Sequence, residues 1–355
     1  MRKLLPLLCL LLTLTGCSGL PYPREMGDMA LLRTMGVDPE EEGVALTVST
    51  GPRARGIQGE TEPSLVLSAR GGSLGQAALA LQGLSDSYVF FGYVDQLLLG
   101  EELTGQGVLP LLDYFARDVE LGLGAQVWAI RGSSAREAVE SGGEKGVEGS
   151  LSTLRTDGEM GVAAIARTAG EVYADLLEWG AAYLPALELS GEEGATLLDG
   201  GYAILKDGAL VGYLEGEEAR GLELLAGAPA AHVLTLALPQ AGEVTVRITG
   251  AVTVCRLTAE GGLKVNCRVT AHLLEYAWSL TREELGLARE QIREQEGERL
   301  DRTLDRLREL ETDCLGLGPQ AGLFRPALWS SLEEDWPEHF ARLEPEIKVG
   351  VELYE

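Results

Sequence analysis

This chain of 355 residues has few basic side chains and few histidines, and it lacks the cysteine pattern of a disulfide-rich or metal-binding protein. Lysine and arginine total 29 against 55 acidic residues, which gives a formal net charge of −26. Such a chain is repelled by nucleic acid, so nucleic acid is excluded as a partner. The three histidines and five cysteines occur at no spacing that resembles a metal site, and we predict no metal and no cofactor.

Long hydrophobic runs are also absent after residue 14. The stretch Val162–Leu187 is interrupted by charged residues, and Ala228–Ala241 is too short for a transmembrane helix, which takes about 20 apolar residues. We therefore predict no transmembrane helix in the mature chain. The 45% of hydrophobic residues is nevertheless enough for sizeable buried cores, so we expect a folded protein of two or three domains.

The N-terminus has the features of a bacterial export signal. Two basic residues precede a leucine-rich run that ends at Leu14 and is too short for a stable membrane span. The run leads into Thr15-Gly16-Cys17, which together with Leu14 resembles the lipobox of bacterial lipoproteins. We predict a signal peptide at 1–16, cleavage between Gly16 and Cys17, and a lipidated tether at 17–23 that reaches the membrane through lipid on Cys17. The alternatives are a soluble secreted protein cleaved elsewhere and an uncleaved signal anchor.

Three cysteines remain after the signal peptide and the lipidated residue are set aside, namely Cys255, Cys267 and Cys314. Cys255 and Cys267 lie on two β-type runs on either side of a turn near Gly261, which would set them opposite each other. A disulfide between them is geometrically possible outside the cytoplasm. The alternative, which the odd number of cysteines favours, is three buried free thiols.

Helices and strands alternate in the first half of the chain, which indicates an α/β unit. We expect an N-terminal domain at 24–190, with a helix that begins at Ser73, a buried strand at 88–93 and a second helical stretch at 97–115. Glycine, serine and glutamate dominate the region 132–161, and we expect a linker or a long exposed loop there.

The second half has the signals of β-hairpins and of one long helix. Asp207-Gly208 separates two apolar runs and predicts a tight hairpin, because both residues tolerate positive φ. The sequence that begins at Thr281 has the capping-box pattern of a helix start. The expected C-terminal domain at 198–355 contains a hairpin at 202–213, a hairpin at 244–273, a long helix at 281–311 and a final strand at 347–354. We expect an α/β (α+β) ectodomain with mixed or antiparallel sheets flanked by helices.

One short motif resembles the nucleophile of a hydrolase. Residues 71–75 fit G-x-S-x-G, the turn that carries the serine of α/β-hydrolases. The three histidines, His232, His272 and His339, are scattered and have no supporting motif. Ser73 is better interpreted as the N-cap of the following helix, and we predict no catalytic residue.

Five stretches, in order along the chain, carry a resemblance to a known family. They are the lipobox, 24–38 ending in Met35-Gly36-Val37-Asp38, 91–102 with 111–118, 205–221 around the Asp207-Gly208 turn, and 313–318 with Trp329 and Trp336. On these stretches the chain resembles the Ger(x)C family, the lipoprotein C subunits of endospore germinant receptors. Members often have a histidine after the Phe-Gly pair, where this chain has Tyr93, so we expect no metal chemistry there.

The resemblance implies three α/β units, anchored by lipid on the outer face of the spore inner membrane. The chain would work beside two membrane subunits of the same germinant receptor, one of them transporter-like, in triggering germination when nutrients are present. Together with the missing catalytic motifs, this indicates a subunit that is not an enzyme. A small-molecule-binding lipoprotein of an importer is the alternative.

Asp113, Arg117 and Asp118, within one of the five stretches, form the candidate surface for a partner. The alternative is that Asp113 and Arg117 only pair at helical spacing and hold the local fold.

Overall fold

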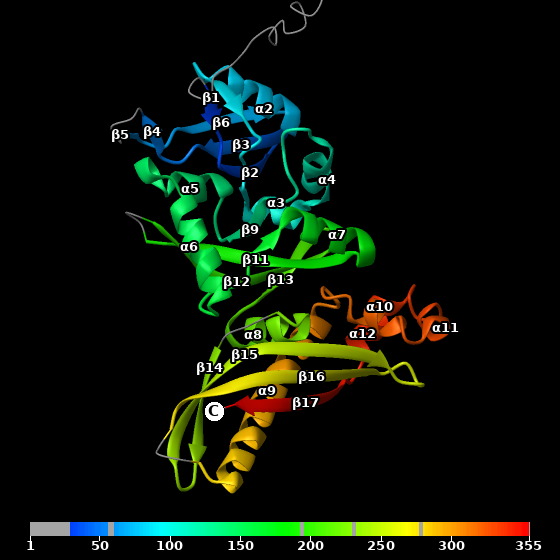
Figure 1. Ribbon diagram of the computed structural model, residues 1–355. Helices are drawn as coiled ribbons and strands as arrows, with labels where there is room; N and C mark the ends of the chain where they lie inside the picture. The colour runs from blue at the N-terminus through cyan, green and yellow to red at the C-terminus, as the bar shows by residue number, and fades with distance from the viewer. Residues whose placement is uncertain (1–28, 56–59, 192–194, 229–231, 277–279, 355) are drawn as a thin grey trace, which may run out of the picture.

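The computed structural model describes residues 29–55, 60–191, 195–228, 232–276 and 280–354. Within these ranges the chain forms two units, each built on one large β-sheet with helices packed against it (Figure 1). The mixed class of helix-flanked sheets is confirmed. The predicted signal peptide, the cleavage site between Gly16 and Cys17, and the tether lie outside the described residues. No helix of the described part is long and apolar enough to cross a bilayer.

The large sheet of the N-terminal unit, at the top of Figure 1, has nine strands around a parallel centre. The strands are β2 (Thr34–Glu40), β3 (Gly43–Ser49), β6 (Val66–Gly71), β8 (Gln96–Leu99), β9 (Gln126–Arg131), β10 (Arg167–Thr168), β11 (Ala181–Ser190), β12 (Thr196–Lys206) and β13 (Ala209–Leu214). Their order is β13-β12-β11-β9-β8-β2-β3-β6, with β10 paired to β9. β2, β8, β9 and β11 run parallel, and antiparallel strands extend the sheet on both sides.

Two small sheets accompany this large one. They are β1 (Met29–Leu31) with β7 (Tyr88–Phe90), which pair in parallel, and β4 (Arg53–Arg55) with β5 (Glu60–Glu62), which pair antiparallel. β1 is the first described element of the chain, and it lies at the upper end of the molecule in Figure 1.

Helices cover both faces of the nine-stranded sheet. They are α2 (Leu74–Gln82), α3 (Glu101–Gln106), α4 (Leu109–Arg117), α5 (Ala135–Glu140), α6 (Glu148–Glu159) and α7 (Ala169–Trp179), with a 3₁₀ turn at Gly143–Lys145. Leu97 and Leu99 of β8 pack in a core with α2, α3, α4 and α7, whereas Leu98 packs in a second core with α5 and α6. Because β8 is buried on both faces, its sequence is a continuous apolar run.

The predicted helical stretch at 97–115 is wrong in its first part. Its leucines at 97–99 belong to β8, and two separate helices, α3 and α4, follow. Gly107, with φ of 125°, separates the two helices. A short apolar run does not distinguish a buried strand from a helix, and the flanking glycines are the signal that does.

The region 132–161, where we expect a linker or an exposed loop, instead forms α5 and α6. Val139, Val147 and Leu151 are each at most 1% exposed, and they pack in the second core. The carboxylate of Asp38, near the end of β2, accepts hydrogen bonds from the first two backbone amides of α5 at 2.8 and 2.9 Å. The polar composition is misleading here, because a few apolar residues, these three with Ala135 and Ala138, are enough to attach the two short helices to the sheet.

The hairpin predicted at 202–213 consists of β12 and β13, but it does not belong to a separate C-terminal sheet. Asp207 and Gly208 form its turn, with φ of 53° and 83°. β12 also pairs with β11 along nearly its whole length, so the hairpin extends the N-terminal sheet. The domain boundary that we expected between residues 190 and 198 therefore falls inside one sheet. The structure has two units where the resemblance implied three.

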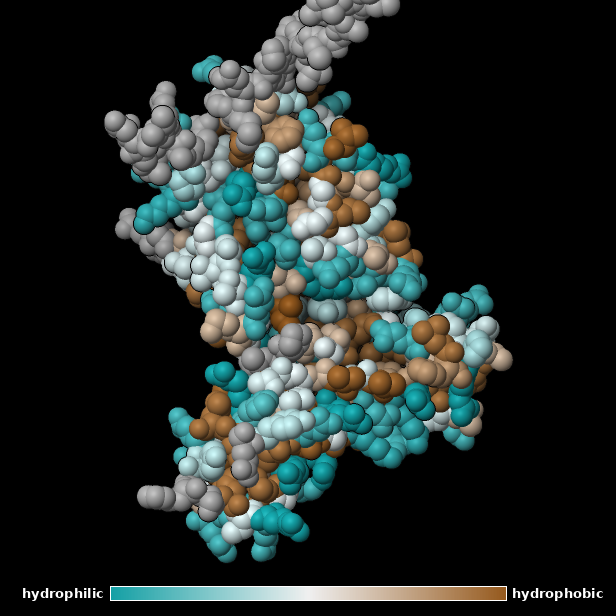
Figure 2. All heavy atoms as spheres, viewed as in Figure 1, coloured by the Kyte–Doolittle hydropathy of each residue, from teal (hydrophilic) through white to brown (hydrophobic). Residues whose placement is uncertain are grey.

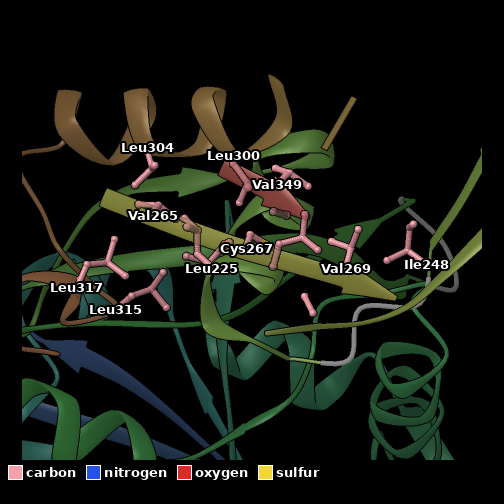
Figure 3. Close-up of a cluster of buried hydrophobic side chains, with 14 of the residues drawn as sticks. Leu225, Ile248, Val265, Cys267, Val269, Leu300, Leu304, Leu315, Leu317 and Val349 are labelled. Carbon is pink, nitrogen blue, oxygen red and sulfur yellow. The ribbon is translucent and has the colours of Figure 1, made fainter. Parts of the chain in front are cut away.

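The C-terminal unit is a four-stranded sheet with one long helix against it. Its elements are α8 (Gly216–Ala226), β14 (His232–Leu238), β15 (Gly242–Leu257), β16 (Leu263–Glu275), α9 (Arg282–Glu309), α10 (Leu317–Gly322), α11 (Pro326–Trp329), α12 (Trp336–Arg342) and β17 (Glu346–Tyr354). The strand order is β14-β15-β16-β17, and β17 is parallel to β16. Figure 3 shows Val265 of β16 and Val349 of β17 close to Leu304 and Leu300 of α9, and Ile248 of β15 belongs to the same buried core.

The three cysteines of the C-terminal unit are buried free thiols. In the β15–β16 hairpin, Cys255 lies opposite Val265 and Cys267 lies opposite Thr253, so the two sulfurs are offset along the strands. The disulfide considered between Cys255 and Cys267 is therefore not formed. Burial raises the pKa of Cys255 to about 12, which keeps the thiol protonated and unreactive.

Candidate partner surface

The three residues of the predicted partner surface lie at the C-terminal end of α4. This helix is amphipathic. The side that faces the sheet consists of Leu111, Leu112 and Phe115, each of which is at most 3% exposed. Asp113 and Arg117 therefore lie on the outer side. The helix ends at Asp118, whose backbone is extended.

Asp113 is held by side chains of two helices. Its Oδ1 accepts hydrogen bonds from Arg117 at 2.9 and 3.1 Å and from the hydroxyl of Tyr173 in α7 at 3.1 Å. The pairing of Asp113 and Arg117 at helical spacing is thus present, and it links α4 to α7. Because the Arg117 side chain is still 77% exposed, the same residue is also accessible to a partner.

Asp118 organises the loop that follows α4. Its Oδ1 accepts hydrogen bonds from the backbone amides of Glu120 and Leu121 at 2.8 and 3.2 Å. The carboxylate of Glu120 in turn accepts hydrogen bonds from the Tyr88 hydroxyl and the Phe91 amide at 3.1 and 3.3 Å. These bonds fix the loop in one shape, and in that shape it presents Val119, which is 99% exposed.

A small cavity of about 170 Å³ lies beside Val119. Phe91, Tyr114 and Leu121 are among its lining residues, together with Ala78 of α2. Burial, with Asp118 nearby, raises the pKa of Tyr114, so its hydroxyl remains a neutral hydrogen-bond donor. Hydrophobic side chains also show on this side of the N-terminal unit, over α2 and α4 (Figure 2).

We call Phe91, Tyr114, Arg117 and Val119 the Val119 surface. Its cavity is smaller than the roughly 300 to 1,000 Å³ typical of small-molecule sites. An exposed apolar residue on a rigid loop, beside aromatic rings and an arginine, has instead the composition of the centre of a protein interface. The charged residues of this surface can be identified from the sequence, but Val119 cannot, because a single valine between two acidic residues gives no periodic signal.

The other residues considered for chemistry do not converge. Ser73 follows β6 and caps α2, accepting a hydrogen bond from the Gln76 amide at 3.3 Å. All three histidines lie in the C-terminal unit, where His232 contacts Glu296 and His339 contacts the Gly261 carbonyl. Within the described ranges, no group of three or more His, Cys, Asp or Glu side chains is arranged to hold a metal ion.

Comparison with known families covers nearly the whole chain. Residues 23–189 match a family described as spore germination protein N-terminal domain, and residues 200–355 match one described as spore germination B3/GerAC like, C-terminal. The chain belongs to this spore germination protein family. The resemblance to the Ger(x)C family is therefore confirmed.

One solved structure supports the fold of this germination protein family member. It is described as the crystal structure of the GerBC protein, and it matches with a TM-score of 0.60 over 95% of this chain and 99% of that chain. The sequence identity is 17%, so the match shows a shared fold. No curated protein matches the chain.

Proposed function

We propose that this chain is the lipid-anchored subunit of a nutrient germinant receptor. It acts through contacts with membrane subunits of that receptor, one of them transporter-like, on the outer face of the spore inner membrane. The observation that carries the proposal is the match of both halves of the chain, together spanning 23–189 and 200–355, to the spore germination family. The lipobox sequence that ends at Cys17 supplies the proposed attachment to the membrane.

The Val119 surface supports a role that depends on contact and not on catalysis. Its residues are held by hydrogen bonds of Asp118 and Glu120 within the loop, so a partner would meet a preformed surface. Such a surface loses little conformational freedom on binding. We also propose that the chain is not a hydrolase, since Ser73 caps α2 in one unit and the three histidines lie in the other.

The shape of the molecule favours a receptor subunit over the capture protein of an importer. A capture protein would have two similar lobes around a ligand cleft. Here a nine-stranded sheet with a parallel centre forms one unit, and a four-stranded sheet forms the other.

Affinity isolation of the tagged chain from spore membranes tests the proposal. We expect two membrane proteins to accompany the wild-type chain and to be lost in a Val119→Asp variant, since a buried unpaired carboxylate opposes the interface. Val162→Asp is the matched control, because Val162 is 68% exposed and follows α6 on the other side of the sheet. Isolation of an ATP-driven importer instead would contradict the proposal.

A further inference from the structure

A second surface, at the tip of the C-terminal unit, has the chemistry of a docking site. A cavity of about 730 Å³ lies where the β15–β16 turn meets the end of α10. It is lined by Arg256, Lys264, Phe324 and Arg325, together with Glu260, Glu346 and residues of the turn. None of these residues belongs to the Val119 surface, which is on the other unit.

The charge of this cavity differs from that of the rest of the molecule. Acidic residues outnumber basic ones 55 to 29, so most exposed arginines of the described chain contact a carboxylate. Arg256 and Arg325 form no ion pair with any carboxylate of the described residues. Two guanidinium groups without such partners therefore line the same cavity in a strongly acidic protein.

The two carboxylates of the cavity are already held by other groups. Glu346 accepts hydrogen bonds from Lys264 at 2.7 Å and from Lys348 at 3.1 Å. Hydrogen bonds from its own backbone amide and from Thr258 lower the pKa of Glu260, with smaller effects of the charges of Arg325 and Lys264. Both carboxylates are thus ionised, and they leave Arg256 without a direct partner.

Apolar side chains stand beside these arginines. Leu323 and Phe324, at the end of α10, are 80% and 59% exposed, and they are consecutive in the chain. The Arg256 guanidinium lies over the Phe324 ring, 5.0 Å from its centroid, so ring and cation form one platform. Aromatic and arginine side chains of this kind are enriched at the energetic centres of protein interfaces.

We propose that Arg256, Leu323, Phe324 and Arg325, named the Phe324 surface, bind an acidic segment of a partner protein in which a carboxylate stands next to an apolar side chain. The carboxylate would meet the two guanidinium groups, and the apolar side chain would cover Leu323 and Phe324. Charge complementarity favours an acidic partner, because Arg256 and Arg325 form no ion pair within the described part of their own chain and can therefore bind a carboxylate of another protein. This inference rests on the proposed function, because the partner is a subunit of the same receptor.

The position of the surface favours a protein over the bilayer as its occupant. α10 lies on one side of the C-terminal unit, whereas β1, the first described element, lies at the far end of the N-terminal unit (Figure 1). Attachment through Cys17 therefore brings the other unit to the membrane. A protein that rises from the membrane can reach the Phe324 surface from the side.

Site-specific photo-crosslinking in spores tests this inference. A benzophenone amino acid replaces Phe324 in the full chain, and the crosslinked peptide is identified by mass spectrometry. We expect a single protein segment that contains Asp or Glu beside an apolar residue. A crosslink to phospholipid, a crosslink to a segment without acidic residues, or no crosslink at all would overturn the inference. Benzophenone at position 119 tests the proposed function separately, because a crosslink there with none at 324 overturns only the inference.

The identified segment, made as a fluorescent synthetic peptide, then serves as the binding probe for the full chain in detergent. We expect Arg256→Glu and Arg325→Glu each to weaken peptide binding at least tenfold, and higher salt to weaken binding to the wild type. Arg342→Glu is the control, since Arg342 is 79% exposed on α12 of the same unit. Equal affinity of all four proteins would overturn the inference, as would binding of the full chain to phosphatidylglycerol vesicles that is lost in Arg256→Glu.

Discussion

The indole nitrogen of Trp336 donates a 2.9 Å hydrogen bond to the carboxylate of Asp313, which lies 23 residues earlier in the chain. The same carboxylate accepts hydrogen bonds from the backbone amides of Leu317 and Gly318, both at 2.8 Å. Asp313 is buried, and it thus fixes the turn before α10 and the start of α12 at once. The segment 313–318 and Trp336, which together form the last of the five stretches that carry the family resemblance, are therefore in direct contact.

Gly318 allows this contact to form. Its Cα faces the Trp336 ring, and an added Cβ would overlap the indole atoms. We expect Gly318→Ala to lower the free energy of unfolding by about 1 to 3 kcal/mol, the usual cost of overpacking. Urea denaturation measures the change. Gly286→Ala is the control, because Gly286 lies within α9 with no atom near its missing Cβ, and there alanine should stabilise by about 0.5 to 1 kcal/mol. Equal effects of the two substitutions would contradict this role of Gly318.

Glu296 of α9 makes the C-terminal unit sensitive to acid. It is fully buried, 2.8 Å from His232 and 2.6 Å from Arg299. Burial by itself raises the pKa of Glu296, but the hydrogen bonds and charges of His232 and Arg299 outweigh it, so the pKa lies below its ordinary value. The stabilisation is therefore present above the ordinary glutamate pKa of about 4.3 and is lost as pH falls through the lowered pKa.

We expect Glu296→Gln to reduce the free energy of unfolding by about 1.5 to 3 kcal/mol at pH 7, since it removes one of the two carboxylates that contact the buried Arg299, Glu217 being the other. The difference from the wild type should shrink as pH falls from 7 to 3, because the wild-type carboxyl becomes neutral as well. Denaturation at a series of pH values measures both changes. Glu298→Gln, at an exposed position of the same helix, should change stability little at any pH. A difference that stays constant down to pH 3 would contradict the account.

Several elements in the second half of the chain follow from local chemistry that the sequence displays. Asp207-Gly208 can take positive φ, and it does so in the turn between β12 and β13. The capping box that begins at Thr281 starts α9, in which Thr281 and Glu284 exchange hydrogen bonds. Such signals act over four residues or fewer, so no tertiary contact is needed to predict them.

The sequence does not predict features that depend on distant contacts. α5 is stabilised by Asp38, almost 100 residues away. Its own local signal, the capping box of Ser134 and Glu137, is easily overlooked because glycines and serines lie on both sides of this short helix. The pairing of β12 with β11 also depends on tertiary contacts, and because of it the first unit extends beyond the domain boundary expected from the sequence. At the candidate site, Arg117 could be found from its charge, whereas Val119 becomes visible only once its loop is folded.

Substitution of Leu304 tests whether α9 packs on the C-terminal sheet. It is 1% exposed and points toward the strands (Figure 3). We expect Leu304→Ala to lower the free energy of unfolding by about 2 to 5 kcal/mol, because it leaves a cavity in the core. Leu287→Ala is the control on the same helix, since Leu287 is 39% exposed and should cost less. A change below about 0.5 kcal/mol for Leu304→Ala would place this side chain at a surface.

Substitution of Cys17 tests whether lipid anchors the chain to the membrane. In a detergent phase partition, the wild-type chain should enter the detergent phase, because two or more acyl chains hold a protein at a membrane durably. Cys17→Ala should remain in the aqueous phase, since the part of the chain that the structure describes has no helix able to span a bilayer. Cys314→Ala, which alters a buried thiol, should partition as the wild type does. Retention of the Cys17→Ala chain with the detergent would contradict lipid anchoring.

Germination of spores that lack this chain tests the central claim most directly. Loss of optical density after nutrient addition is measured for the parent, for the deletion strain and for deletion strains that carry the wild-type gene or Ser73→Ala. The account predicts normal spore formation, loss of the response through this receptor alone, and restoration by both genes, because Ser73 caps a helix and catalyses nothing. A deletion strain that germinates normally with every nutrient its parent answers, in the absence of a second copy of the receptor, would contradict the account.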